Sequence, residues 1–440
     1  MPSSTIAPTE GGLSRRGFLA GTAATAALSA GLVTMGSRFA FATPENTSQG
    51  DVVVALFLRG GADGLSLVAP YAMPSYQALR PTIRVKAPGE VAAENAALPL
   101  VAGGAVAPFA LDGVLGMNPG LAALHAGPWS AGDLAIVHAA GMPAAESDTR
   151  SHFDSMKNWE VGSASINYSS GFLNRYLATI PGVERIDAVG LGGHLQRSLA
   201  GQVSAFSMYS PESFNVGGFS SNSRARTALT SFYDAGTTDL LLTTGADTMA
   251  AIGMVAAIDW SQFQPQNGAV YGDSEPAQGL RDVARLIRAN IGLRAVALDF
   301  GGWDTHEGMG APEDPNSYFR QHAADLGDAL AAFHQDLGAD MAEVTLFTMT
   351  EFGRTINENG SGGTDHGRGS VQFVMGANVR GGVYGDFVSS ITDGPEGDLA
   401  VLNDWRRSVA EVLTVRGGAG TSATIFPTMA PSAPLGICEP

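Results

Sequence analysis

Residues 344–368 read VTLFTMTEFGRTINENGSGGTDHGR, in which a continuous apolar run passes directly into a glycine-rich loop of charged residues. The run 344–349 has the length of a strand and lacks the alternation of a half-exposed strand. It therefore predicts a strand that is covered on both faces, as in parallel sheets. The loop carries Glu351, Asp365 and His366. Carboxylates and an imidazole just beyond a buried strand indicate a site that binds a cation or carries out a reaction.

Other apolar runs of the same kind repeat along the chain, at 52–58, 134–140, 295–300 and 371–376. Helix-like stretches lie among them and near the end, at 151–162, 275–292, 315–337 and 404–418. This alternation predicts an α/β fold with a doubly wound, mostly parallel sheet and helices on both faces.

Two less regular regions belong to the same single domain, which we expect to span 43–440. Residues 80–120 are rich in Ala, Pro and Gly, and we expect an insertion over one sheet edge there. Residues 205–280 are rich in Ser, Thr and Gly, and we expect a helical or loop-rich cap there.

The start of the chain has the layout of an export signal. Arg15 and Arg16 precede an uncharged run (17–36), and the sequence AFA ends at Ala42. The arginine pair, followed by Phe-Leu, predicts the twin-arginine route and its export machinery as a partner. An uncleaved membrane anchor is the alternative, but a run rich in Gly, Ala and Thr is only weakly apolar. We expect residues 1–42 to be removed, leaving a soluble periplasmic or secreted protein without stable membrane insertion.

Charge and cysteine content narrow the classes of partner. The whole chain has a formal charge of −17, and without residues 1–42 it has 22 basic and 41 acidic residues, or −19. Such acidity argues against nucleic acid as a partner, because phosphate backbones need Lys and Arg to displace their counterions.

Cys438 is the one cysteine, so no intramolecular disulfide can form. A chain of this length can rely on its apolar core instead.

Four predicted strands are each followed by charged or polar residues. Ligands of open α/β sheets bind beyond the carboxyl ends of the strands, so we expect these residues to meet at one edge. In chain order they are Arg59 and Asp63, then Asp148, Arg150, Ser151 and His152, then Asp304, His306 and Glu307, and finally Glu351, Arg354, Asp365 and His366.

The carboxylates and histidines in this set predict a metal site. Asp304 and His306 are two residues apart and would point the same way on an extended segment. Asp365 and His366 are adjacent, and in a glycine-rich loop they can converge on one ion, bind neighbouring ions, or act as one ligand and one group that hydrogen-bonds to a ligand. The mixture favours one or two divalent ions, such as zinc, manganese, magnesium or calcium. The expected ligands are Asp63, Asp304, His306, Glu351, Asp365 and His366, although Asp63 in GGADG could equally be a turn residue.

The remaining polar groups predict a nucleophile and an anion site. Ser151 stands at an expected helix start, where it can be a helix cap, a metal-activated nucleophile, or both. Arg354 is the first candidate to steady a tetrahedral anion, and Arg59, Arg150 and His152 are placed at the substrate. Each arginine could equally form a structural ion pair. The other histidines lack neighbouring carboxylates and are interpreted as structural, namely His125, His138, His194, His322 and His334.

Several motifs together resemble those of the bacterial family called domain of unknown function 1501. They are FLRGGADGLS, SHFDSMKNWEVG, GGWDTHEG, TEFGRT, NGSGGTDHG and DWRRSVAEVL, with the arginine-pair signal, and they span nearly the whole mature chain. That family is grouped with the alkaline phosphatase superfamily, which also includes sulfatases, phosphodiesterases and cofactor-independent phosphoglycerate mutases. The resemblance implies a doubly wound α/β sheet with metals at the carboxyl ends of its strands.

The resemblance also implies roles for individual residues. The first-strand aspartate of the superfamily matches Asp63. Its nucleophile is similar in position to Ser151, with Thr149 as a competitor. Its aspartate and histidine of one metal resemble Asp304 and His306, although the usual spacing is wider.

The later aspartate-histidine pair of the superfamily can be aligned in two ways. In one, Asp365 and His366 form the pair, and the final histidine is missing. In the other, which we prefer, Glu351 replaces the aspartate, Phe352 replaces its histidine, and His366 supplies the final histidine. Either alignment loses one ligand of the two-zinc set, which implies a single or altered metal site.

These features together predict an exported metal-dependent hydrolase of phosphate or sulfate esters with a serine nucleophile. One alternative is a non-catalytic envelope or export-associated binding protein that keeps the fold. Another is a sulfatase-like or phosphomutase-like enzyme acting on a carbohydrate. The segment SHFDS lacks the Cys/Ser-x-Pro-x-Arg setting of typical sulfatases. The expected substrate is a small-molecule or carbohydrate ester.

Overall fold

The computed structural model describes residues 51–100, 113–164, 169–180, 186–214, 223–233, 240–386, 397–417 and 422–439. The signal segment predicted over 1–42 lies outside these ranges. The described residues belong to one unit, Gln49–Pro440. No helix among them is both long enough and apolar enough to cross a bilayer.

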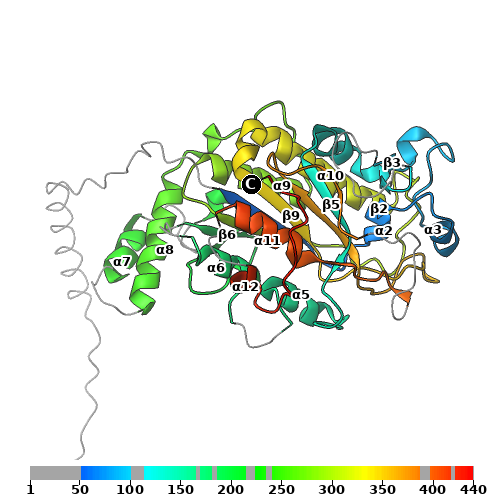
Figure 1. Ribbon diagram of the computed structural model, residues 1–440. Helices are drawn as coiled ribbons and strands as arrows, with labels where there is room; N and C mark the ends of the chain where they lie inside the picture. Colours follow the sequence, from blue (N-terminus) through cyan, green and yellow to red (C-terminus); the bar gives the residue numbers. More distant parts are fainter. Residues whose placement is uncertain are drawn as a thin grey trace, which may run out of the picture. The chain divides into compact units, whose positions relative to one another are not determined.

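A central sheet organises this unit, with the strand order β11-β5-β10-β9-β1-β8-β6-β7 and with β12 paired to β5 (Figure 1). Five of its strands are those that the apolar runs predict. The strands are β1 (Val52–Leu58), β5 (Leu134–Gly141), β6 (Ala188–Leu191), β7 (Phe206–Met208), β8 (Ala295–Phe300), β9 (Val344–Met349), β10 (Ser370–Met375), β11 (Gly382–Tyr384) and β12 (Asn403–Asp404).

The sheet is parallel except at β10, which runs antiparallel to both β5 and β9. The mostly parallel prediction is confirmed, but the parallel interpretation of 371–376 was wrong. The loop 350–369 leaves β9 and returns to the sheet without a crossover helix, so β10 starts at the edge where β9 ends. Burial on both faces gives the same apolar run in either direction, so the sequence pattern carried no sign of the reversal.

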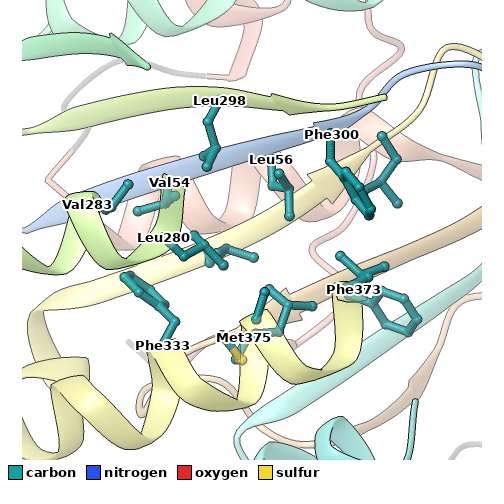
Figure 2. Packing of buried hydrophobic residues seen from close by; sticks show 14 of the residues in the cluster. Val54, Leu56, Leu280, Val283, Leu298, Phe300, Phe333, Phe373 and Met375 are labelled. Carbon is teal, nitrogen blue, oxygen red and sulfur yellow. The ribbon is translucent and has the colours of Figure 1, made fainter. Parts of the chain in front are cut away.

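Helices cover both faces of the sheet. On β1, Val54 and Leu56 belong to the core that the apolar sides of α9 (Glu275–Arg288) and α10 (Tyr318–Leu337) complete (Figure 2). Val53 and Ala55 belong to a second core on the other face. That core includes side chains of α5 (His152–Val161), α6 (Phe172–Leu177) and α11 (Trp405–Val415). The four predicted helices are therefore present, and the doubly wound arrangement is confirmed.

The region 80–120 contributes to a small antiparallel sheet beside the main one. Its strands are β2 (Val68–Ala69), β3 (Leu98–Pro99) and β4 (Gly116–Met117), in the order β2-β4-β3. Residues 101–112 lie outside the described ranges. Short helices accompany it, namely α2 (Gly64–Leu67), α3 (Pro74–Leu79) and α4 (Ala122–Leu124).

The region 205–280 begins within the main sheet rather than above it. Its first residues form the edge strand β7, and the helices α7 (Ser223–Tyr233) and α8 (Leu240–Ala256) follow. Residues 215–222 and 234–239 lie outside the described ranges. That this region forms a cap over the site stays a prediction. The last helix of the chain is α12 (Ser422–Ile425).

Candidate metal centre

Glycine lets the loops at the carboxyl ends of β1, β8 and β9 approach one another closely. Gly60 has a φ of +121°, and a Cβ there would lie 2.5 Å from the backbone nitrogen of Asp304. Gly353 is as tightly placed, since a Cβ would lie 1.7 Å from the carbonyl oxygen of Gly369. Side chains at these positions would push the loops apart, so the glycines bring together residues distant in the sequence.

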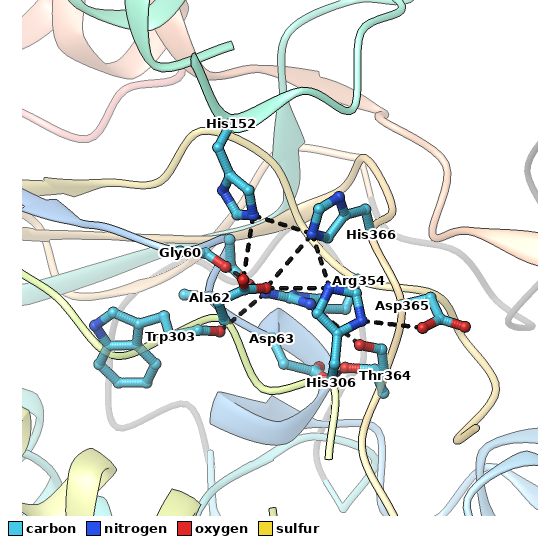
Figure 3. A network of polar contacts seen from close by, with 12 residues as sticks. Gly60, Ala62, Asp63, His152, Trp303, His306, Arg354, Thr364, Asp365 and His366 are labelled. Carbon is cyan, nitrogen blue, oxygen red and sulfur yellow. Dashed lines mark hydrogen bonds and ion pairs between the residues drawn. The ribbon is translucent and has the colours of Figure 1, made fainter. Parts of the chain in front are cut away.

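The loops that follow β5, β8 and β9 deliver nitrogen and oxygen donors to one place. The donor atoms of His152, Asp304 and His366 all lie within 4.8 Å of one another. His306 adjoins this group, because its Nε2 lies 2.9 Å from Nε2 of His366 and 3.2 Å from Oδ1 of Asp304. Figure 3 shows the three imidazole rings turned toward a common centre. We call these four residues the metal centre, as a candidate site for an ion.

Each ring of the metal centre is held through its other nitrogen. Nδ1 of His152 lies 2.8 Å from Glu351, and Nδ1 of His306 lies 3.0 Å from Asp365. Nδ1 of His366 lies 2.9 Å from the backbone carbonyl oxygen of Arg150. A carbonyl or a carboxylate can only accept, so the proton of each neutral ring is assigned to Nδ1. Each Nε2 then presents a lone pair to the centre.

Facing lone pairs at such distances repel one another unless something positive lies between them. Nε2 of His366 is 3.0 Å from Nε2 of His152 as well as 2.9 Å from that of His306. A divalent cation would turn this repulsion into coordination, and histidine ligands commonly donate their second N–H to a carboxylate or carbonyl in this way. The donor set of imidazole and carboxylate suits zinc and related ions.

The pKa shifts of His366 and Asp304 agree with this reading, and that of His152 does not. Burial lowers the pKa of His366, and the nearby Arg354 guanidinium lowers it further, which favours the neutral ring. Burial would raise the pKa of Asp304, but the hydrogen bond and charge of Arg354, together with the nearby His152 and His306, outweigh it, and the pKa lies below its usual value. The hydrogen bond with Glu351 raises the pKa of His152, which favours protonation of that ring until an ion displaces the proton. Asp304 is therefore an ionised oxygen donor beside a neutral imidazole.

Residues 134–393 match the model of a family described as protein of unknown function (DUF1501), which covers more than half of the chain. The chain belongs to this family. None of the curated proteins matches it. A similar solved structure is the lipoteichoic acid synthase LtaP from Listeria monocytogenes, with 9% identity over 76% of this chain and 67% of that one. Its TM-score is 0.25.

Two of the predicted ligands in this DUF1501 chain, Glu351 and Asp365, contact histidines of the metal centre instead of belonging to it. Glu351 is buried, and its Oε1 contacts both Nδ1 of His152 and the backbone N–H of Gly60, at 2.8 and 2.9 Å. Asp365 supports His306 and also accepts from Asn359 at 3.2 Å. For Asp365 the supporting role was one of the predicted alternatives. For Glu351 it replaces the expected position among the ligands.

The structure places Asp63 outside the metal centre. Both of its carboxylate oxygens contact Nη1 of Arg80, at 2.8 and 2.9 Å, and the side chain also caps α2 by accepting from the N–H of Ser66. Thr364 donates to it at 3.1 Å. Asp63 and Arg80 are both buried. The turn reading of Asp63 therefore fits its contacts, and the ligand role does not.

Arg354 is a structural residue in these contacts and not an anion-binding one. Its side chain is 0% exposed, and it donates to Oδ1 of Asp304 at 2.7 Å. Its other contacts are to backbone carbonyl oxygens, namely those of Gly60, Gly61, Trp303 and Thr364. The guanidinium thus ties the loops together and leaves no open face for a substrate.

The other predicted arginines also form ion pairs. Arg59 contacts Glu160 at 3.3 Å and Asp299 at 2.8 Å. Arg150 contacts the buried Asp398 at 2.9 Å, while its backbone carbonyl holds His366. The structural alternative that the sequence left open therefore describes both side chains.

Ser151 begins α5 as its cap residue and lies between two residues of the site. Its hydroxyl accepts from the N–H of Asp154 at 3.5 Å, which is a long contact, and the residue is exposed. Arg150 before it supports His366, and His152 after it is part of the metal centre. Thr149 accepts from the backbone N–H of Ser151 at 3.1 Å. The helix-cap role is present, and the nucleophile role stays a prediction.

His152 is the member of the metal centre that sequence reasoning assigned elsewhere, to the substrate. One signal could have corrected this, because three of the four strand-end loops carry a histidine and His152 opens the helix after β5. The histidines interpreted as structural do contact other groups: His125, His138 and His322 face backbone carbonyls, and His194 and His334 face aspartates.

Proposed function

We propose that this chain is an exported, metal-dependent hydrolase of phosphate or sulfate esters. The observation that supports it most is the convergence of three imidazole Nε2 atoms and the Asp304 carboxylate while every Nδ1 has an acceptor. That pattern belongs to preformed metal sites, since it would be repulsive without a cation. Its place beyond the carboxyl ends of parallel strands is where ligands of α/β sheets bind.

In this proposal His152, His366 and Asp304 hold one divalent ion, with His306 as an adjoining donor. Glu351 orients His152, Asp365 orients His306, and the carbonyl of Arg150 orients His366. When bound, the ion would act as a Lewis acid and lower the pKa of a coordinated oxygen. A second ion remains an expectation from the sequence, and a site for it is not part of this proposal.

Ser151 is the proposed nucleophile. It stands at the N-terminus of α5, a helix of ten residues, where the helix dipole favours a developing negative charge. Its weak capping contact leaves the hydroxyl oxygen available for attack on phosphorus or sulfur. Attack would form a seryl ester and release the alcohol, and water would then cleave the seryl ester.

Two alternatives remain as competitors. One is a non-catalytic envelope or export-associated binding protein that keeps the metal centre. It would bind the ion but would turn over no ester. The other is a sulfatase-like or phosphomutase-like enzyme acting on a carbohydrate, which would share the metal centre and differ in the alcohol it accepts.

The decisive experiment measures metal and turnover together. The mature chain would be purified as wild type, as His366→Ala and as His194→Ala, a matched control whose exposed ring lies outside the metal centre. We expect bound divalent metal and turnover of p-nitrophenyl phosphate, bis-p-nitrophenyl phosphate or p-nitrophenyl sulfate in wild type and control, and loss of both in His366→Ala. Metal without turnover of any ester would favour the binding protein. Absence of metal from wild type would refute the proposal.

The nucleophile needs its own test. We expect Ser151→Ala to keep its metal but lose turnover by about 100-fold or more. Acid quenching of wild type during turnover should yield a peptide of residues around 151 that carries phosphate or sulfate, detected by mass spectrometry. If Ser151→Ala turns over at the wild-type rate, a water activated at the metal centre is the nucleophile instead.

A further inference from the structure

The cationic side chains around the metal centre are already engaged by protein groups. Arg354 is fully buried and spends its donors on Asp304 and on backbone carbonyls. Arg59 lies between Glu160 and Asp299. The positive charges of these guanidinium groups are balanced by carboxylates of the protein. They therefore present little positive charge to a substrate.

A second arginine pair beside the centre is neutralised in the same way. Asp398 has a buried side chain, and its Oδ2 lies 2.9 Å from Arg150 and 3.0 Å from Arg368. Arg368 also contacts Asp148, whose side chain is 74% exposed. Two guanidinium groups are thus matched by two carboxylates, and the loop that carries Ser151 stays near neutral.

The metal centre itself has a negative formal charge before any ion binds. Three carboxylates belong to it or support it, namely those of Asp304, Glu351 and Asp365, and among the arginines that the structure describes only Arg354 contacts them. With neutral imidazoles their formal charge is −2, which one divalent ion would bring to zero. The mature chain adds a strongly acidic background.

These charges bear on the substrate, and the argument rests on the proposed function. A phosphate monoester is largely a dianion above neutral pH, so it needs an excess of positive charge at its site. A phosphate diester or a sulfate monoester carries a single negative charge. We infer that the substrates are singly charged tetrahedral esters, in preference to phosphate monoesters. At short range one extra unit charge changes binding enough to decide between the two classes.

The test compares three esters with one leaving group at pH 8, namely p-nitrophenyl phosphate, methyl p-nitrophenyl phosphate and p-nitrophenyl sulfate. For each, kcat/KM of the metal-loaded mature chain is divided by the uncatalysed rate constant, which removes intrinsic reactivity. We expect at least about a tenfold greater enhancement for the diester or the sulfate than for the monoester. A larger enhancement for methyl p-nitrophenyl phosphate than for p-nitrophenyl sulfate would indicate a phosphodiesterase, and the reverse would indicate a sulfatase.

A charge variant ties the preference to these residues. Asp148→Asn removes an exposed carboxylate that faces Arg368 and touches no member of the metal centre. We expect it to raise the monoester enhancement relative to the other two esters by a few-fold. Glu439→Gln is the matched control, because Glu439 pairs with Arg380 near the start of β5, at the opposite edge of the sheet, and its ratio should equal that of wild type.

The outcomes separate the two claims. A larger enhancement for p-nitrophenyl phosphate would overturn the charge inference and leave the hydrolase proposal standing. An Asp148→Asn ratio equal to that of wild type would also count against the inference, because the local charge would not govern the choice. Failure to turn over all three esters by metal-loaded protein would overturn the proposed function itself, and the inference with it.

Discussion

Glu351 and His152 are joined by a contact of 2.8 Å between Oε1 and Nδ1, and the same Oε1 accepts the backbone N–H of Gly60 at 2.9 Å. One buried carboxylate therefore orients an imidazole of the metal centre and fixes the loop that follows β1. The two residues are 199 positions apart. The centre consequently exists only in the folded chain, and its metal affinity should respond to groups that never touch the ion.

The first prediction concerns Glu351→Gln. The amide keeps the size of the side chain but removes the charge that makes His152 a strong donor. We expect metal affinity to fall by about 10- to 100-fold with the fold intact. Titration against a competing chelator measures the affinity, and circular dichroism checks the fold. Glu307→Gln is the control, since Glu307 is exposed beside His306, and its affinity should match that of wild type. Unchanged affinity in Glu351→Gln would remove Glu351 from the support of the centre.

The second prediction concerns Asp398, which positions the metal centre without touching it. Its carboxylate binds Arg150 and Arg368, and these residues lie next to the segments that carry His152 and His366. Asp398→Asn should loosen the carbonyl of Arg150 from Nδ1 of His366. We expect a fall of about tenfold in metal affinity. A shifted ring resonance of His366 in the NMR spectrum of metal-loaded protein would show that the lower affinity comes from the altered contact between this ring and the Arg150 carbonyl. Affinity and resonance both equal to wild type would contradict it.

Much of the fold could be predicted because it depends on local patterns. The apolar runs at 52–58, 295–300 and 344–349 coincide with β1, β8 and β9, since a strand buried on both faces must be apolar throughout. The direction of β10 could not be predicted, because it follows from the path of the preceding loop. The edge strand β7 was missed because three residues carry no readable period.

The candidate site was predicted as a set of residues more accurately than as a set of roles. Position at the carboxyl ends of strands identified Asp304, His306 and His366, because sheet topology brings such residues together. Roles depend on side-chain partners, and these are tertiary. Arg80, the residue directly after α3, forms an ion pair with Asp63, and no local sequence pattern indicates that pairing.

The third prediction separates structural from ligand roles for Asp63. Arg80→Ala leaves a buried carboxylate without its partner, so we expect a loss of about 3–5 kcal/mol in the free energy of unfolding. Urea denaturation of metal-free protein measures it. In the double variant Asp63→Asn with Arg80→Ala, the loss should be smaller than the sum of the losses of Asp63→Asn and Arg80→Ala alone, because the unpaired charge is gone.

Metal content completes that test. If the Asp63→Asn variant folds, it should bind divalent metal with wild-type affinity, because the native Asp63 side chain contacts Arg80 and Thr364 and lies outside the metal centre. A fall in affinity like that of His366→Ala would restore Asp63 to the ligands. A double variant whose loss equals the sum of the single losses would show that the pair is not coupled.

The last prediction is a dependence of stability on pH that comes from two histidines outside the metal centre, His138, which is buried, and His322, which is partly buried. Burial lowers the pKa of His138 to about 4 and that of His322 to about 4. In the unfolded chain a histidine takes up its proton at a pKa of about 6.5. Between these values the unfolded state binds more protons than the folded state, so the free energy of unfolding falls as the pH is lowered from 6.5 toward 4.

Each histidine should contribute a slope of about 1.4 kcal/mol per pH unit within this window. His322 stacks on Tyr318 and contacts the carbonyl of Gly301 at 2.8 Å, so His322→Gln should lower stability at pH 7 but remove its share of the slope. Urea denaturation at several pH values, with chelator present to keep metal out of the balance, measures the slopes. Because carboxylates titrate at the lower end of the same range, the informative quantity is the difference in slope between wild type and variant. Equal slopes would mean that His322 is protonated in the folded protein as readily as in the unfolded chain.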